Sequence, residues 1–167
     1  NHFGSLYYGD RTGSRFYLVM QRQTGNAGDV DISSNFTTGN WGPGFTNRDN
    51  SLMANLFTKF HGLEFFGTLE RAKGTTLSGA DFNFGQYGVE GLFRFGKDEQ
   101  FYAGAKYNAA KNQTPSRVNR LEVGAGWKPI PNIIIKAEYV DQNYKNFDIY
   151  GGGAGFDGFM VETAVSF

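Results

Sequence analysis

Residues 159–167 read FMVETAVSF, and this stretch decides the fold class of the 167-residue chain. Every second position from Phe159 to Phe167 is aromatic or β-branched, and the positions between them include Glu162 and Ser166. Successive side chains of a strand point to opposite faces of a sheet. The stretch therefore predicts a strand with one apolar face and one polar face.

The same alternation recurs in earlier segments of the chain. Residues 16–20 continue it less regularly, and residues 3–8 form the weakest candidate strand. No helical period and no internal repeat is present. The pattern predicts an all-β fold, an antiparallel up-and-down β-barrel with eight or nine strands in this chain. Its clearest segments are 52–60, 63–69, 87–95, 101–107, 121–127 and 133–139.

The connections between these segments agree with a barrel that crosses a membrane. Such barrels have short turns on the periplasmic side and longer loops outside. Proline is confined to places where no ladder hydrogen bond is donated, and we expect all four prolines in connections. They are Pro43, Pro115, Pro129 and Pro131. The short connections are 61–62, 96–99 and 128–132, and the longer ones are 24–50, 74–83 and 146–156.

Composition narrows the functional classes. The formal net charge is zero, so no electrostatic signal points to a nucleic-acid partner. The chain has no cysteine, which excludes disulfides and thiolate metal sites. No apolar run approaches the roughly 20 residues of a membrane-spanning helix. With 17% aromatic residues and 24 glycines, the composition favours β structure.

Glycines on the polar face indicate which face lies inside the barrel. A soluble lipocalin-like barrel also alternates, but its apolar face points inward. Here the polar face carries Gly88, Gly104, Gly124 and Gly126 among its charged residues. A crowded lumen needs small residues beside long ones, whereas a solvent-exposed strand gains nothing from glycine. We therefore expect the polar face inside and the apolar face against lipid.

Eleven charged residues are predicted to face the lumen. Charges of both signs would pair into a network in a narrow lumen, or line a water-filled channel in a wide one. No ring of a single sign is evident, so strong ion selectivity is not expected. The residues are Lys59, Glu64, Glu70, Glu90, Arg94, Lys106, Arg120, Glu122, Lys136, Glu138 and Glu162.

Nine outward aromatic residues are predicted to lie at the membrane interfaces, at two levels. The pairs Tyr87 to Phe95 and Phe159 to Phe167 are each eight residues apart. On tilted strands this spacing spans roughly 20 Å of the membrane normal, near the apolar band of outer-membrane barrels. The nine residues are Phe60, Tyr87, Phe95, Phe101, Tyr107, Trp127, Tyr139, Phe159 and Phe167.

The ending VETAVSF at 161–167 resembles the terminal strand of outer-membrane β-barrel proteins. In that family, a final aromatic residue after alternating apolar residues helps recognition by the barrel assembly machinery. Residues 8–15 (YGDRTGSR), residues 62–67 (GLEFFG) and the ending resemble porin-like outer-membrane barrels of Bacteroidota. The resemblance implies a bacterial outer-membrane location, with outer-membrane lipid and lipopolysaccharide around the barrel. It brings no catalytic residues.

The strand count bears on whether the chain is a whole barrel. Bacterial single-chain barrels have even strand numbers. Either residues 1–9 lie outside an eight-stranded barrel, or the chain is the carboxy-terminal part of a larger one. We expect the second, with residues 1–167 as one barrel domain that is incomplete at its amino terminus.

Two functions are compatible with these features. The first is a porin-like barrel that passes small polar solutes. The alternative is a narrow structural or adaptor barrel that anchors the envelope or joins membrane protein partners. No enzyme, cofactor or metal site is expected, because the only histidines are His2 and the predicted turn residue His61. The loop 24–50 could fold inward as a constriction or bind a partner outside.

Overall fold

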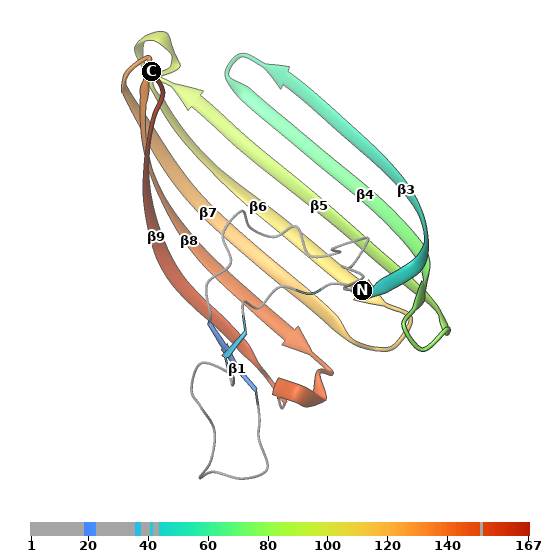
Figure 1. Cartoon of the computed structure of the whole chain (residues 1–167). Coiled ribbons are helices and arrows are strands. Elements are labelled where there is room, and N and C mark those ends of the chain that lie inside the picture. Colours follow the sequence, from blue (N-terminus) through green and yellow to red (C-terminus); the bar gives the residue numbers. More distant parts are fainter. Residues whose placement is uncertain (1–18, 23–35, 38–40, 42–43, 151) are drawn as a thin grey trace.

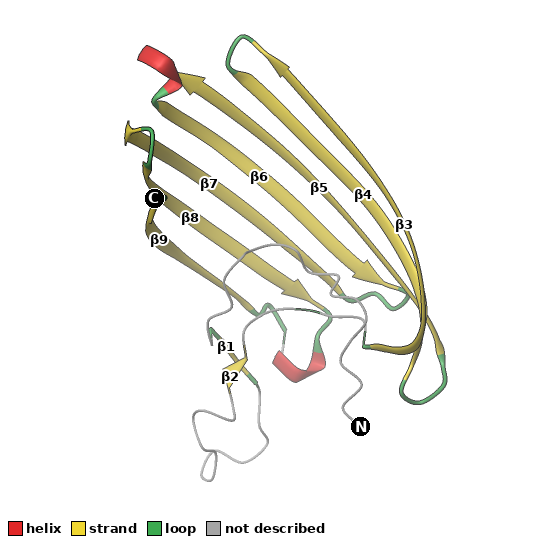
Figure 2. Cartoon of the chain, turned by 45° about the horizontal axis from the view of Figure 1, so that its top comes forward, coloured by secondary structure: helices red, strands yellow, loops and turns green. Residues whose placement is uncertain are grey.

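A computed structural model describes residues 19–22, 36–37, 41, 44–150 and 152–167. Seven long strands form one antiparallel sheet in chain order, and each is bonded to the next one along the chain. The sheet curls into a half-barrel (Figures 1 and 2). The strands are β3 (Phe45–Phe60), β4 (Leu63–Thr76), β5 (Asp81–Phe95), β6 (Phe101–Asn112), β7 (Arg117–Ile130), β8 (Ile133–Lys145) and β9 (Gly155–Val165).

The predicted all-β, antiparallel up-and-down fold is confirmed, but a closed barrel of eight or nine strands is not formed by the described residues. The sheet has β3 and β9 at its edges, and neither edge is paired within the described part of the chain. Closure would require these two edges to find partners. Any closed barrel formed by this chain would therefore contain the seven-stranded sheet as part of its wall.

The predicted strand at 16–20 does not join the main sheet in its described part. Met20–Gln21 forms β1, which pairs with β2 (Phe36–Thr37) in a separate two-stranded sheet. Met20 is buried against Val118 and Tyr144 of the main sheet. The Met20 side chain is therefore buried by contacts with side chains of the main sheet, whereas its backbone pairs with β2. The predicted strand at 3–8 and residues 16–18 lie outside the described residues.

The strands extend further than their alternation predicted. Residues 45–50 belong to β3, and the expected loop 74–83 shrinks to residues 77–80 because β4 continues to Thr76. These extensions carry polar residues on the face that is apolar elsewhere, such as Arg71 and Asn83, so hydrophobic periodicity does not reveal them.

Two kinds of connection mark the two ends of the sheet. One end, here called the turn end, has the connections 61–62, 96–100 and 131–132, and the other, the loop end, has 77–80, 113–116 and 146–154. At the turn end His61 and Gly62 have φ of 46° and 79°. Two positive φ angles fit the two-residue type I′ hairpin turn, whose twist matches that of the strands.

One predicted proline position is wrong. Pro129 lies inside β7, where the pairing with β8 shifts register between Trp127 and Ile130. A bulge leaves a residue without its ladder partner, which suits a residue that has no N–H to donate. Pro115 and Pro131 lie in connections as predicted, and Pro43 lies outside the described residues.

Buried apolar side chains gather on the concave side of the sheet near the loop end. One cluster comprises Phe45, Ala72, Phe84 and Ala110, and a second contains Met20, Val118 and Tyr144. Trp41 packs against both, with its ring 4.7 Å from that of Phe84 and 4.8 Å from that of Phe147. The Trp41 side chain therefore lies over the concave face. None of the helices among the described residues is long and apolar enough to cross a membrane.

Candidate functional site

The strand registers assign the predicted site residues to two faces. We call the concave face the inner face and the convex face the outer face. All eleven charged residues predicted for the lumen share the inner face: for example, Lys59 pairs with Glu64, and Lys136 with Glu162. Eight of the nine predicted aromatic residues lie within strands on the outer face. The ninth, Phe167, lies beyond the end of β9, two residues later than the strand reaches.

The outer-face aromatic rings form two rows at different levels. Nearer the turn end, Phe101 lies between Phe95 and Trp127, at centroid distances of 5.6 and 6.3 Å. Nearer the loop end, the ring of Tyr139 is 5.0 Å from that of Phe159, and Tyr87 is 6.2 Å from Tyr107. These contacts group seven of the nine predicted aromatic residues at two positions along the strands, and their location at membrane interfaces stays a prediction.

Between and around these rows the outer face is apolar and open to its surroundings. Phe159 is 86% exposed and Val161 is 73% exposed. We call this surface the apolar band. Its residues outside the two aromatic rows are mainly Leu52, Leu56, Phe60, Leu63, Phe65, Leu69, Val89, Phe93, Leu121, Val123, Ile135, Val161 and Val165.

The apolar band ends before the loop end of β4, β7 and β8, at positions that shift along the register: Leu121 is in the band, whereas its partner Asp141 is beyond it. Toward the loop end, Leu69 is followed on the outer face by Arg71, Leu121 by Asn119, and Tyr139 by Asp141. Near these positions the inner face changes in character, because the buried clusters around Phe84 and Val118 lie there. Toward the loop end the inner face therefore has buried apolar clusters, and the polar side chains of Glu70 and Gln86 are buried beside them.

At the turn end the inner face carries a four-residue ionic cluster. Arg94 Nε lies 2.8 Å from Glu64 Oε1, and its Nη2 donates to the second carboxylate oxygen at 3.3 Å. Lys59 Nζ bridges Glu64 at 3.2 Å and Glu99 at 3.1 Å. The bidentate arginine fixes the carboxylate orientation, because two parallel hydrogen bonds allow only one geometry.

A second network crosses the middle of the inner face. Arg120 is 8% exposed and donates to Glu122 at 2.6 Å and to Gln142 at 3.1 Å. Gln142 in turn donates to the hydroxyl of Tyr144, and Lys106 lies 3.8 Å from the other oxygen of Glu122. A buried guanidinium needs such partners, since an unpaired buried charge is strongly unfavourable.

Two further groups complete the pairing on this face. Lys136 Nζ lies 3.1 Å from Glu162 and 4.0 Å from Glu138. Glu70, 2% exposed, accepts hydrogen bonds from Ser51 at 2.8 Å and from Gln86 at 2.6 Å. Among the described residues, ion pairs of opposite charge thus include nine of the eleven predicted residues.

Inner-face glycines make room for long neighbours, as the sequence predicted. A Cβ built on Gly126 would lie 2.1 Å from the ring of Tyr102, and one on Gly88 would lie 2.4 Å from Asn108 Oδ1. Tyr102 therefore lies flat over Gly126 on the neighbouring strand. The guanidinium carbon of Arg94 lies 5.7 Å from the centre of the Tyr102 ring.

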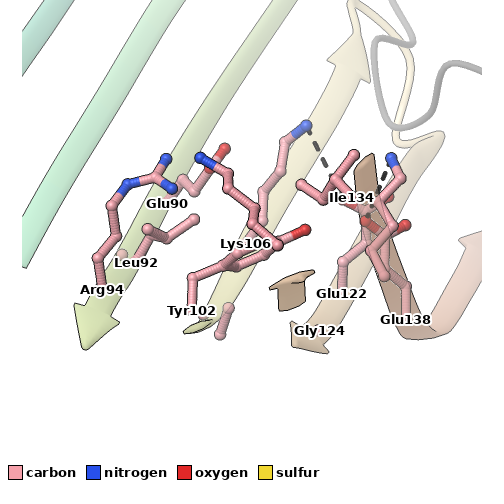
Figure 3. A pocket seen from close by; sticks show the side chains of 14 residues that line it. Glu90, Leu92, Arg94, Tyr102, Lys106, Glu122, Gly124, Ile134 and Glu138 are labelled. Carbon is pink, nitrogen blue, oxygen red and sulfur yellow. Dashed lines mark ion pairs between the residues drawn. The ribbon is translucent and has the colours of Figure 1, made fainter. Parts of the chain in front are cut away.

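Side chains of β5, β6, β7 and β8 line an open cavity on the inner face (Figure 3). Its volume is about 330 Å³. Charged residues of both signs line it. The basic ones are Arg94, Lys106, Lys128 and Lys136, and the acidic ones are Glu90, Glu122 and Glu138.

Family models, curated proteins and solved structures gave no match to this chain. The arrangement of the side chains is therefore the basis for what this site can bind. Among the described residues no group of three or more histidine, cysteine, aspartate or glutamate side chains is placed to hold a metal ion. His61 is exposed in its hairpin turn.

The alternation places Tyr102 and Gln142 on the polar face, but the sequence does not predict their contacts, nor those of Gln86, Tyr144 and Trp41. Tyr102, Gln86, Gln142 and Tyr144 complete the polar networks, and Trp41 closes one end of the concave face. The signal for Tyr102 was its place opposite glycines in the alternation. The sequence around Trp41 does not predict which face of the sheet this side chain contacts, although an inward fold is one of the two possibilities for the loop 24–50. Its described residues Trp41 and Phe45 do pack on the inner face.

Proposed function

We propose that this chain forms part of a bacterial outer-membrane β-barrel that passes small polar solutes along its inner face. One observation carries the proposal: over the length of the apolar band the outer face is apolar and exposed, while the inner face carries the ion-pair clusters together with the apolar side chains Met53, Phe57 and Phe66. Hydrocarbon outside and water inside is the environment that satisfies both faces.

The curvature of the sheet supports this orientation. In a soluble barrel the apolar face would be concave and would pack into a core. Here the side chains of the apolar band, such as Leu52 and Phe159, are on the convex side, and the ion-paired groups of Glu64, Arg94, Arg120 and Glu122 are on the concave side, together with the exposed side chain of Phe57. A convex apolar band in water would expose far more apolar surface than a monomeric soluble protein carries.

Conductance of the reconstituted intact protein tests solute passage. We expect ion-conducting steps in planar bilayers with weak selectivity between cations and anions, because the inner cavity carries both signs. Liposome swelling in a series of uncharged sugars would give the size limit. Absence of both conductance and sugar flux in correctly inserted protein would reject the transport proposal.

A second function, a narrow structural or adaptor barrel, is favoured by a different observation. Trp41, Phe45 and Met20 cover the loop end of the inner face, and the charges below them are already paired. This arrangement fits a lumen filled by the protein's own residues. The two functions are separated by Trp41→Ala, which should raise conductance of a pore and leave a filled barrel non-conducting.

A further inference from the structure

A row of basic residues crosses the outer face on the loop-end side of the apolar band. By register, Arg71, Gly85, Lys111, Arg117 and Lys145 lie in one line across β4 to β8. The four cationic side chains are exposed, and none forms an ion pair with another described residue. Like charges directly opposed on adjacent strands repel, so the row favours a bound anion.

A hollow of about 520 Å³ opens in this row, where Gly85 provides no side chain. Arg71, Lys73 and Lys111 line it, together with the side-chain amides of other lining residues, and none of its twelve lining residues is acidic. Ammonium, guanidinium and amide groups are all hydrogen-bond donors to phosphate oxygens. The lining therefore favours a phosphate group with further hydroxyl or ester oxygens.

The hollow continues into the apolar band. Leu52, 77% exposed, lines its lower edge, and the register places it opposite Arg71 on the adjacent strand. An occupant can therefore place an anionic group among the cations and hydrocarbon along Leu52 and Leu69. A free phosphate ion would use only the first of these two surfaces.

We propose that this hollow binds the phosphate-bearing headgroup of an anionic lipid, whose acyl chains lie on the apolar band. The proposal rests on the membrane location proposed above. It goes further in assigning a specific lipid site to Arg71, Lys73 and Lys111 at the loop-end boundary of that band. Binding is expected to weaken with salt, since exposed charges are screened over about 10 Å at 0.1 M ionic strength.

The test compares two double variants with the same loss of charge. Native mass spectrometry of the detergent-solubilised chain, with added phosphatidylglycerol or phosphatidylcholine of equal acyl chains, measures lipid affinity. Arg71→Gln/Lys111→Gln should weaken phosphatidylglycerol binding about 25-fold, because each cation at an anionic lipid surface contributes about fivefold. Arg22→Gln/Lys97→Gln removes two exposed charges elsewhere and should leave affinity unchanged.

A third variant tests the hollow without changing charge. A Cβ on Gly85 would meet its nearest neighbour at 3.7 Å, an ordinary contact, so Gly85→Leu should fold and fill the hollow. It should reduce phosphatidylglycerol binding while every cation remains. Equal affinity for the two lipids, equal affinity in the two double variants, or full displacement by millimolar inorganic phosphate would overturn the lipid site.

Flotation with phosphatidylcholine vesicles separates this site from the membrane location itself. A wild-type chain that enters these vesicles but shows no preference for phosphatidylglycerol would remove the lipid site alone. A chain that does not enter them would remove the proposed function, and the lipid site with it.

Discussion

Val161 lies near the middle of the apolar band, where the surroundings of a side chain depend on its depth. Val161→Arg should lower the free energy of unfolding by roughly 2 to 4 kcal/mol, the cost of a cation at the bilayer midplane. Asn143→Arg is the matched control, since Asn143 is on the same face beyond the band and beside Asp141. Urea unfolding in lipid vesicles measures both, and equal losses would place the band outside the membrane.

Glu122 and Glu138 are both inner-face carboxylates, but their partners differ. Glu122 accepts from the buried Arg120, whereas Lys136 beside Glu138 retains Glu162 at 3.1 Å. Glu122→Gln should therefore cost about 1 to 3 kcal/mol, the range for a hydrogen bond to a charged group. Glu138→Gln should cost less. Denaturant titration of the two variants gives the comparison, and the reverse order would contradict the network described here.

Asp49 gives a pH-dependent prediction outside the apolar band. Burial, and then the nearby Glu70, raise the pKa of Asp49, and its Oδ1 is buried without a hydrogen-bond partner among the described residues. A raised pKa in the folded state means that stability is lost as pH rises through the titration range. Asp49→Asn should remove this loss. The difference in urea midpoint between variant and wild type should grow from pH 4 to pH 7, and a constant difference would contradict it.

At the scale of the strand, alternation identified both faces of all seven long strands but not their ends. The apolar period stops where the outer face turns polar, and the backbone ladder continues through residues such as Arg71 to Thr76 and Asp81 to Gln86. Pro129 was misplaced because a bulge accommodates it inside β7. The sequence predicts that inner-face charges of both signs pair with one another. It does not predict individual partners such as Arg120 and Gln142, because these depend on the strand register, which a sequence pattern does not contain.

The two tryptophans of the chain lie on opposite faces of the sheet and report on them separately. Trp127 is part of the outer aromatic row, and Trp41 packs between Phe84 and Phe147 on the inner side. In vesicles of brominated lipid, fluorescence from Trp127 in Trp41→Phe should be strongly quenched. Fluorescence from Trp41 in Trp127→Phe should be quenched much less. Stronger quenching of Trp41 would mean that the two faces are exchanged.

At the scale of the whole molecule, the direction of the edge strands restricts how the sheet can close. Seven antiparallel strands leave β3 and β9 running in the same direction. Direct pairing of β3 with β9, within one copy or between two copies that cross the membrane in the same direction, would be parallel. Antiparallel closure, as in bacterial outer-membrane barrels, requires an odd number of further strands.

Hydrogen exchange on the assembled protein tests this closure. Amides along both edges should exchange as slowly as those of the central strand β6, because all would be bonded to a neighbour. Amides on the outward side of β3 and β9 that exchange within seconds would show open edges. An even count of added strands in the intact barrel would also contradict the argument.

The basic row across β4 to β8 has a consequence for how such a sheet would be made. If the strands insert from the periplasm with their loop ends leading, Arg71, Lys111, Arg117 and Lys145 must all travel through hydrocarbon before they reach the far water layer. Each crossing costs about 2.5 to 3.5 kcal/mol for a cation at the bilayer centre. Spontaneous insertion into a thick, intact bilayer should therefore be slow, and a locally thinned or opened membrane should accelerate it most.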